Sequence, residues 1–156
     1  MKIIVGADHG GFLLKSVVVK DLQTMGHEVF DAGTHTTDSV DYPDIAKAAA
    51  TRVAEGEFNL GILVCGTGVG ISIAANKLPG VRAACVSDTF SARMARAHND
   101  ANVLCIGERV VGTGLAGELV KAFITTEFEG GRHARRVDKI RQLDGQNKGT
   151  PGTSNC

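Results

Sequence analysis

The stretch LGILVCGTGVGISIAANK, residues 60–77, decides the fold. Its first six residues are continuously apolar, which is typical of a β-strand buried on both faces. Three glycines within five residues, Gly66, Gly68 and Gly70, then lead into the small-residue run ISIAANK, which predicts a helix. A buried strand that passes through a short turn into a helix is the building unit of a parallel sheet covered by helices.

Working outward from this unit, short apolar runs alternate with helix-like stretches along most of the chain. Further strands are predicted for KIIVGA (2–7), HEVFDAG (27–33), VRAACVS (81–87) and NVLCIG (102–107). Further helices are predicted at 12–25, 41–56, 88–100, 113–128 and 132–143. Because parallel strands are joined by right-handed helical crossovers, we expect an α/β fold: a Rossmann-like, doubly wound, five-stranded parallel sheet with helices on both faces.

Length and composition predict a single domain over residues 1–143, followed by a mobile tail over residues 144–156 that is rich in glycine, threonine and asparagine. The 17 basic and 17 acidic residues cancel, so no nucleic-acid or membrane partner is expected. No apolar run is long enough to span a bilayer, and the start, MKIIVGADHGG, lacks the cleavage signature of a secretory signal.

The chain has four cysteines, Cys65, Cys85, Cys105 and Cys156, and none of them forms a C-x-x-C pair. Three of them lie in or at the end of apolar runs, which is typical of reduced thiols and predicts a cytoplasmic protein. Cys85 and Cys105 lie within predicted strands, so we interpret them as small, buried hydrophobic residues.

Ligands of a doubly wound sheet bind at the carboxyl ends of its strands. At the carboxyl ends of four predicted strands, the sequence continues with polar or reactive residues: Asp8–His9, Cys65–Gly66–Thr67, Asp88 and Glu108–Arg109.

The glycine turn exposes backbone N–H groups where a helix begins, and such turns bind anions. A tight connection with nothing bound is the simpler alternative. The turn is not a Walker loop, because Ile71–Ser72 follows Gly70, and it reads G-x-G-x-G rather than G-x-G-x-x-G. Because Asp88 could serve as a ribose-binding acid, a non-catalytic nucleotide-binding module remains an alternative.

Cys65 immediately precedes this turn. A helix N-terminus stabilises a thiolate, so a thiol at this position can act as a base or a nucleophile near neutral pH. The sulfur would then face the glycine turn and be accessible to a ligand. A redox-sensing thiol protein is a third alternative, although no second cysteine lies close to Cys65 in the sequence.

Six motifs resemble those of the type B ribose-5-phosphate isomerases, a family that includes allose-6-phosphate and galactose-6-phosphate isomerases. They are ADHGG (7–11), DYPD (41–44), CGTGVGISIAANK (65–77), HNDANVL (98–104), GERVVG (107–112) and EGGRHARR (129–136). The resemblance covers residues 1–143, with the motifs in the family's order. It implies interconversion of D-ribose 5-phosphate and D-ribulose 5-phosphate, a pentose phosphate reaction, without a metal ion or organic cofactor.

The resemblance also implies roles for individual residues. Cys65 matches the catalytic base, and Ile71 replaces the glutamate that serves as base in another branch of the family. His98 matches the residue that assists opening of the sugar ring, and Thr67 belongs to the catalytic group and the anion hole. The implied substrate-binding residues are Asp8, His9, Gly66, Gly68, Val69, Gly70, Asn99, Arg109, Arg132 and Arg136.

These residue types suit the chemistry. Aldose–ketose isomerisation needs one base that moves a carbon-bound proton and fixed donors that stabilise the cis-enediolate. Arg132 and Arg136 share a helix face and can grip a phosphate, although a solvated basic face is the usual explanation of such spacing.

Several alternatives remain open at this stage. His98 could merely cap its helix, and His27, His35 and His133 are interpreted as surface or structural residues. Asp41–Tyr42–Pro43 is interpreted as a loop lining the pocket. The family resemblance implies a homodimer or tetramer, in which a neighbouring subunit could supply the phosphate-binding arginines. The choice between ribose and allose phosphates also stays open.

Overall fold

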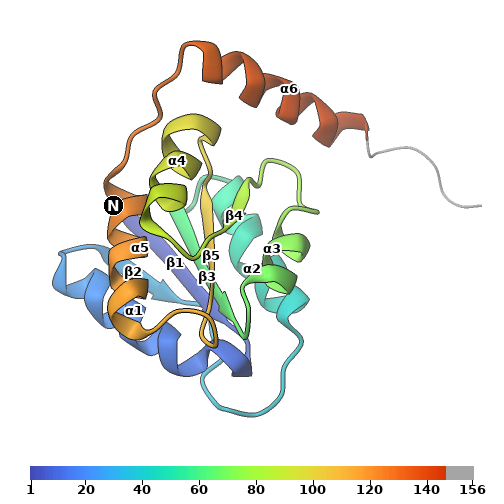
Figure 1. Ribbon diagram of the computed structural model, residues 1–156. Helices are drawn as coiled ribbons and strands as arrows, with labels where there is room; N and C mark the ends of the chain where they lie inside the picture. Colours follow the sequence, from blue (N-terminus) through green and yellow to red (C-terminus); the bar gives the residue numbers. More distant parts are fainter. Residues whose placement is uncertain (147–156) are drawn as a thin grey trace, which may run out of the picture.

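The computed structural model describes residues 1–146, and its sheet confirms the predicted fold class. Five parallel strands are arranged in the order β2-β1-β3-β5-β4 (Figure 1). The strands are β1 (Lys2–Ala7), β2 (Glu28–Asp31), β3 (Leu60–Cys65), β4 (Ala83–Cys85) and β5 (Val103–Gly107). The helices are α1 (Phe12–Thr24), α2 (Tyr42–Ala54), α3 (Val69–Ala75), α4 (Thr89–Asn99), α5 (Thr113–Thr125) and α6 (Arg132–Gln146), with a 3-10 turn, η1 (His9–Gly11).

Helices cover both faces of the sheet because its central strands are apolar on both sides. In β3, Ile62 and Val64 face the core made with α1, α4 and α5, whereas Leu63 and Cys65 face the core made with α2 and α3. Every residue of β3 and β5 is buried. The continuous apolar run that defined β3 in the sequence therefore reflects burial on two faces.

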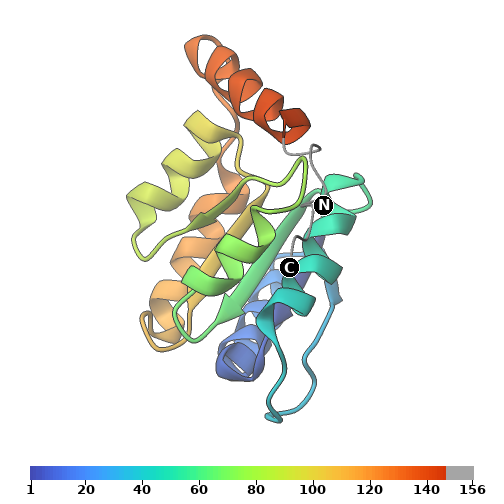
Figure 2. The same ribbon diagram turned by 90° about the vertical axis from the view of Figure 1, so that its right-hand side faces the viewer.

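The path of the chain reverses between β1 and β3. The connection after β1 leads through α1 to β2 at one edge, and the connection after β3 leads through α3 toward β4 at the other edge (Figures 1 and 2). Ligands of such sheets bind where neighbouring loops depart in opposite directions, at the carboxyl ends of those strands. The glycine turn lies at this point of the sheet.

Three features differ from the sequence-based expectations. The helix predicted for 113–128 ends at Thr125, and α6 continues through residue 143 to Gln146. Residues 147–156 of the predicted tail lie outside the described residues. Cys85 is exposed rather than buried, because β4 is an edge strand of only three residues. None of the helices within residues 1–146 has both the length and the apolar character needed to cross a membrane.

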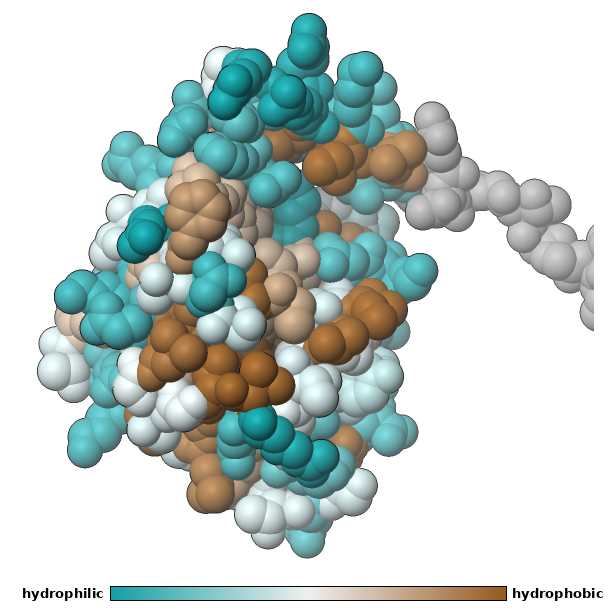
Figure 3. All heavy atoms as spheres, viewed as in Figure 1, coloured by the Kyte–Doolittle hydropathy of each residue, from teal (hydrophilic) through white to brown (hydrophobic). Residues whose placement is uncertain are grey.

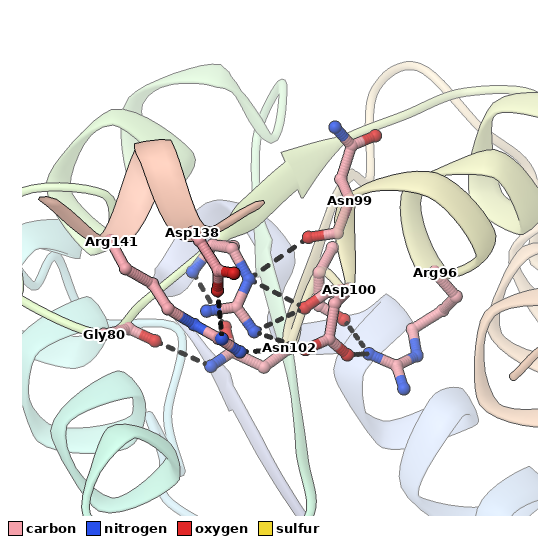
Figure 4. Close-up of polar contacts among 9 residues, drawn as sticks. Gly80, Arg96, Asn99, Asp100, Asn102, Asp138 and Arg141 are labelled. Atoms are coloured by element: carbon pink, nitrogen blue, oxygen red, sulfur yellow. Dashed lines mark hydrogen bonds and ion pairs between the residues drawn. The ribbon is translucent and has the colours of Figure 1, made fainter. Parts of the chain in front are cut away.

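Helix α6 extends away from the sheet and packs against α4 (Figures 1 and 2). Asp100, which ends α4 in the left-handed conformation at φ 46°, helps to hold this arrangement. Its carboxylate lies 2.9 Å from Arg82, 3.0 Å from Arg96 and 3.6 Å from Arg141 of α6. Figure 4 shows Asp100 between Arg96 and Arg141, beside Asn102. One carboxylate thus connects the end of α4, the start of β4 and α6.

Replacing Gly11 with alanine should destabilise the fold. A Cβ at this position would lie 2.6 Å from the backbone carbon of Val64, and neither segment can move without disturbing the sheet. Overpacking of this kind costs about 1–3 kcal/mol. Urea denaturation of Gly11→Ala should show a loss of that size. The control is Gly114→Ala in α5, where the new methyl group meets no atom within 4 Å. A control that destabilises as strongly would contradict the steric explanation.

Replacing Asp100 with alanine should weaken the attachment of α6. Removing this carboxylate leaves two largely buried guanidinium groups, those of Arg82 and Arg96, without their counter-ion. The expected loss in free energy of unfolding is about 2–3 kcal/mol. Asp138→Ala removes only a solvent-exposed partner of Arg141 and should cost less than about 1 kcal/mol. Equal losses in the two variants would show that the network has no special role.

Candidate functional site

The glycine turn after β3 holds the sulfur of Cys65. The backbone N–H of Gly68 donates a hydrogen bond to Cys65 Sγ at 3.1 Å, so the sulfur faces the turn, as expected. Gly68 has φ 78° and caps α3. A Cβ there would lie 2.9 Å from the Ile106 carbonyl carbon, so both conformation and space require glycine. Cys65 itself is buried, with only 4% of its surface exposed, so the accessibility expected from the sequence is not found in the single chain.

The loop after β1 lies beside this turn. A Cβ on Gly10 would lie only 3.3 Å from the Gly66 nitrogen. Asp8 is buried, and its carboxylate accepts a hydrogen bond from the Gly10 N–H at 2.9 Å. Asp8 therefore caps the 3-10 turn η1. His9 is exposed, and its Nδ1 accepts from the Val40 N–H at 3.2 Å, which leaves Nε2 as the nitrogen available to a ligand.

Two further side chains reach the turn from other elements. The backbone N–H of Arg109 donates to the Gly66 carbonyl at 3.0 Å, and its guanidinium carbon lies 3.4 Å from a Cβ placed on Gly66. The ring of Tyr42 lies against Gly70, 2.9 Å from a Cβ placed there. The interpretation of Tyr42 as part of a loop is wrong, because it begins α2, but its ring does lie against the glycine turn.

The turn also presents further polar groups. Thr67 is exposed, and its Oγ1 accepts from the Val69 N–H at 3.3 Å. Within residues 1–146 the N–H groups of Gly66 and Thr67 have no recorded acceptor. This edge of the sheet therefore combines a thiol, backbone donors, a hydroxyl group and a guanidinium group. Such a set can remove a proton and stabilise the oxyanion that results.

The three described cysteines differ in their surroundings. Burial, followed by the influence of Cys85 and Cys65, raises the pKa of the Cys105 thiol well above its usual value. Burial and the nearby Cys65 also raise the pKa of Cys85. Both groups are therefore held in the protonated form. Cys65 is the one whose sulfur accepts a hydrogen bond from a backbone amide, that of Gly68.

The remaining predicted residues lie at the opposite end of the sheet. His98 and Asn99 are the last residues of α4, just before β5 begins at Val103, and Arg132 and Arg136 lie on α6. Five or six strand residues separate these groups from the glycine turn, which corresponds to roughly 16–20 Å. One chain therefore does not bring the four residues together with Cys65 around a single sugar phosphate.

His98 belongs to a compact polar cluster at this end. Its ring stacks on that of His133, with the ring centres 4.1 Å apart and the planes inclined by 2°. The carboxylate of Glu129 lies 3.7 Å from Nε2 of each ring. Burial, followed by the positive charges of His98 and Arg132, lowers the pKa of His133. His133, interpreted from the sequence as a surface or structural residue, is buried against His98.

Asp88, the acid considered for a nucleotide ribose, serves as the N-cap of α4. Its carboxylate accepts a hydrogen bond from the Ser91 N–H at 2.7 Å, and this bond lowers the pKa of Asp88. The geometry gives Asp88 a structural role and adds nothing in favour of a nucleotide site.

Comparison with known proteins agrees with the motifs. The family described as Ribose/Galactose Isomerase matches residues 3–140. Ribose-5-phosphate isomerase B of Escherichia coli is 50% identical over 143 residues, which cover 92% of this chain and 96% of that protein.

Solved structures show the same similarity. Ribose-5-phosphate isomerase B of Clostridium thermocellum superposes with a TM-score of 0.93 at 52% identity, covering 95% of this chain and 100% of that one. The enzyme of Mycoplasma genitalium with bound ribulose-5-phosphate has a TM-score of 0.90 at 42% identity, covering 93% of this chain and 97% of that one. With its fold, its glycine turn and its motifs in agreement, the chain belongs to the ribose/galactose isomerase family and is an isomerase of the ribose-5-phosphate isomerase B type.

Proposed function

We propose that the protein interconverts D-ribose 5-phosphate and D-ribulose 5-phosphate through a cis-enediolate, with Cys65 as the base. The observation that carries this proposal is the hydrogen bond from the Gly68 amide to the Cys65 sulfur. A thiolate at this position lies at the turn whose amides can stabilise the oxyanion.

In the proposed mechanism, the proton that Cys65 removes from the substrate is returned to the substrate. The Cys65 thiolate removes the proton from C2 of the open-chain aldose, and the electrons of that bond form the enediolate. The thiol then returns the proton to C1, while a proton moves between the two oxygens to give the ketose. Thr67, whose hydroxyl lies at the turn, can carry that second proton. The thiolate is regenerated, so one turnover consumes no co-reactant.

We propose further that a complete site needs two chains. Cys65, Thr67 and Arg109 come from one subunit, and His98, Asn99, Arg132 and Arg136 from its neighbour. In this arrangement His98 assists ring opening and the arginines bind the phosphate. The separation of the two groups along the strands supports this assembly.

The surface supports association with a second copy. Several large apolar side chains are exposed: Val69 and Ile73 on α3, Phe90 on α4, and Ile140 and Leu143 on α6. Figure 3 shows apolar surface gathered below α6 and across the middle of the same face. Exposed apolar area of this kind is typical of subunit interfaces. Whether two or four chains assemble is a question for measurements in solution.

Ribose 5-phosphate is preferred to a six-carbon substrate because the similar proteins named above are ribose-5-phosphate isomerases, one of them with bound ribulose-5-phosphate. Allose 6-phosphate remains the alternative, and kcat/KM for a panel of phosphorylated aldoses decides between them. A cytoplasmic location, expected from the reduced cysteines, stays a prediction.

Cys65→Ala should reduce kcat by at least about 10³-fold, because it removes the proposed base and leaves only the donors of the turn. Formation of ribulose 5-phosphate in chelator-treated protein measures the effect, and circular dichroism checks the fold. Cys85→Ala, which removes the neighbouring thiol, is the matched control and should retain most of the activity. Wild-type turnover in Cys65→Ala would remove the proposed base.

Co-expression of two inactive variants should restore activity if the site is shared. One chain carries Cys65→Ala and the other carries Arg132→Ala with Arg136→Ala. Each heterodimer then contains one intact site, so a random mixture should recover about one quarter of wild-type activity. The control pairs Cys65→Ala with Thr67→Ala, which affect the same half of the site and should not complement. Equal activity of the two mixtures would contradict a shared site.

A further inference from the structure

His98, to which ring opening was assigned above, also belongs to a cluster with Glu129 and His133, two residues that have no role in the proposed reaction. The three side chains come from the end of α4, from the segment before α6 and from the first turn of α6. One ligand-type atom from each residue lies within 4.8 Å of the other two. The residue types, two imidazoles and one carboxylate, are the ligand set of many zinc sites.

The distances indicate three groups that surround a point rather than bond to one another. Oε2 of Glu129 lies 3.7 Å from Nε2 of His98 and 3.7 Å from Nε2 of His133, which is too long for hydrogen bonds. Ligand atoms at tetrahedral positions around zinc are about 3.4 Å apart, given metal–ligand distances near 2.1 Å. A contraction of a few tenths of an ångström brings the carboxylate into this range.

The backbone already holds the three residues in place. The Glu129 N–H donates to the Ala97 carbonyl of α4 at 3.0 Å, next to His98. The His133 N–H donates to the Gly130 carbonyl at 2.9 Å and begins α6 four residues after Glu129. His133 is buried, whereas His98 is partly exposed and can tilt. The rings are now stacked and parallel, and an imidazole lone pair lies in the plane of its ring, so both nitrogens can meet one ion only after His98 rotates out of the stack.

We propose that His98, Glu129 and His133 form a binding site for a divalent transition metal ion, with zinc as the best match. The protein supplies three ligands, so the fourth position remains open to water or an anion. Binding displaces the 3.4 Å contact from Arg132 Nε to His133 Nε2. The ion would connect α4 to α6 beside the phosphate-binding arginines.

The consequence of metal binding is inhibition. A metal-bound Nε2 cannot exchange protons, so the ion withdraws His98 from the ring-opening step. This effect on turnover rests on the proposed function, whereas the metal site itself stands on the geometry of the three side chains. The site would make the isomerase sensitive to free zinc without making it a metal-dependent enzyme.

Binding and inhibition are measured separately. The full chain, treated with chelator, is titrated with Zn²⁺ by calorimetry and with Co²⁺ by visible absorption in phosphate-free buffer. We expect one ion per chain and a tetrahedral cobalt spectrum. Glu129→Gln should weaken binding at least about tenfold, and His133→Gln more strongly. Glu129 is exposed, so its substitution leaves the fold intact and keeps the test valid if the His133 variant fails to fold.

Two control variants distinguish zinc binding at this cluster from zinc binding at other side chains of the protein. His35→Gln removes an exposed histidine outside the cluster and should bind zinc like the wild type. Cys65→Ser should also retain the ion, because the thiol is not a ligand of this site. Zinc should inhibit turnover at concentrations that match its binding, and Glu129→Gln should raise that concentration in parallel. Absence of binding, equal affinity of the wild type and Glu129→Gln, or loss of binding only in Cys65→Ser would overturn the proposal.

Discussion

The close approach of the glycine turn to the end of β5 is the constraint on which the candidate site depends. Gly68 occupies a left-handed conformation, and no side chain fits between it and the Ile106–Gly107 backbone. This conformation directs the Gly68 N–H at Cys65 Sγ. A residue with a Cβ would move the amide away from the sulfur. The reactivity proposed for Cys65 is therefore a property of backbone geometry as much as of the thiol.

The two-layered core explains why this geometry can be rigid. β3 and β5 are buried throughout and lie side by side in register, so the loops that follow them start from fixed positions. Backbone hydrogen bonds then join the loops themselves, from Glu108 to the Cys65 carbonyl and from Arg109 to the Gly66 carbonyl. A proton transfer needs reacting groups held to within a fraction of an ångström, which loops without such support do not provide.

At the opposite end of the sheet, ion pairs connect the surrounding helices and loops. Asp100 forms ion pairs with arginines from three segments (Figure 4). At the same helix end, His98 lies against Glu129 and His133. Helix α6 packs on α4, where its Val137 is buried, and these polar contacts add to that attachment. An ion, a phosphate or a second chain bound here would act on a part of the fold that has little apolar core of its own.

The sequence by itself determined the strands, the fold class and the glycine turn, because buried parallel strands and glycine turns leave local patterns, and it predicted Cys65 as the candidate base. It did not predict the burial of Lys15. A lysine on a helix is normally solvated, but here it is 1% exposed and bonded to Asp31 of β2 at 2.7 Å. Nor did it predict that Cys85 is exposed or that His133 stacks on His98.

Only the tertiary structure decided these points, because each depends on residues distant in the chain. For the same reason, the residues of the candidate site are divided between the two ends of the sheet. Strand direction places His98 and Cys65 at opposite ends of the sheet, although both lie near strand termini in the sequence. Local patterns show which residues can do chemistry, and the path of the backbone decides which of them can meet within one chain.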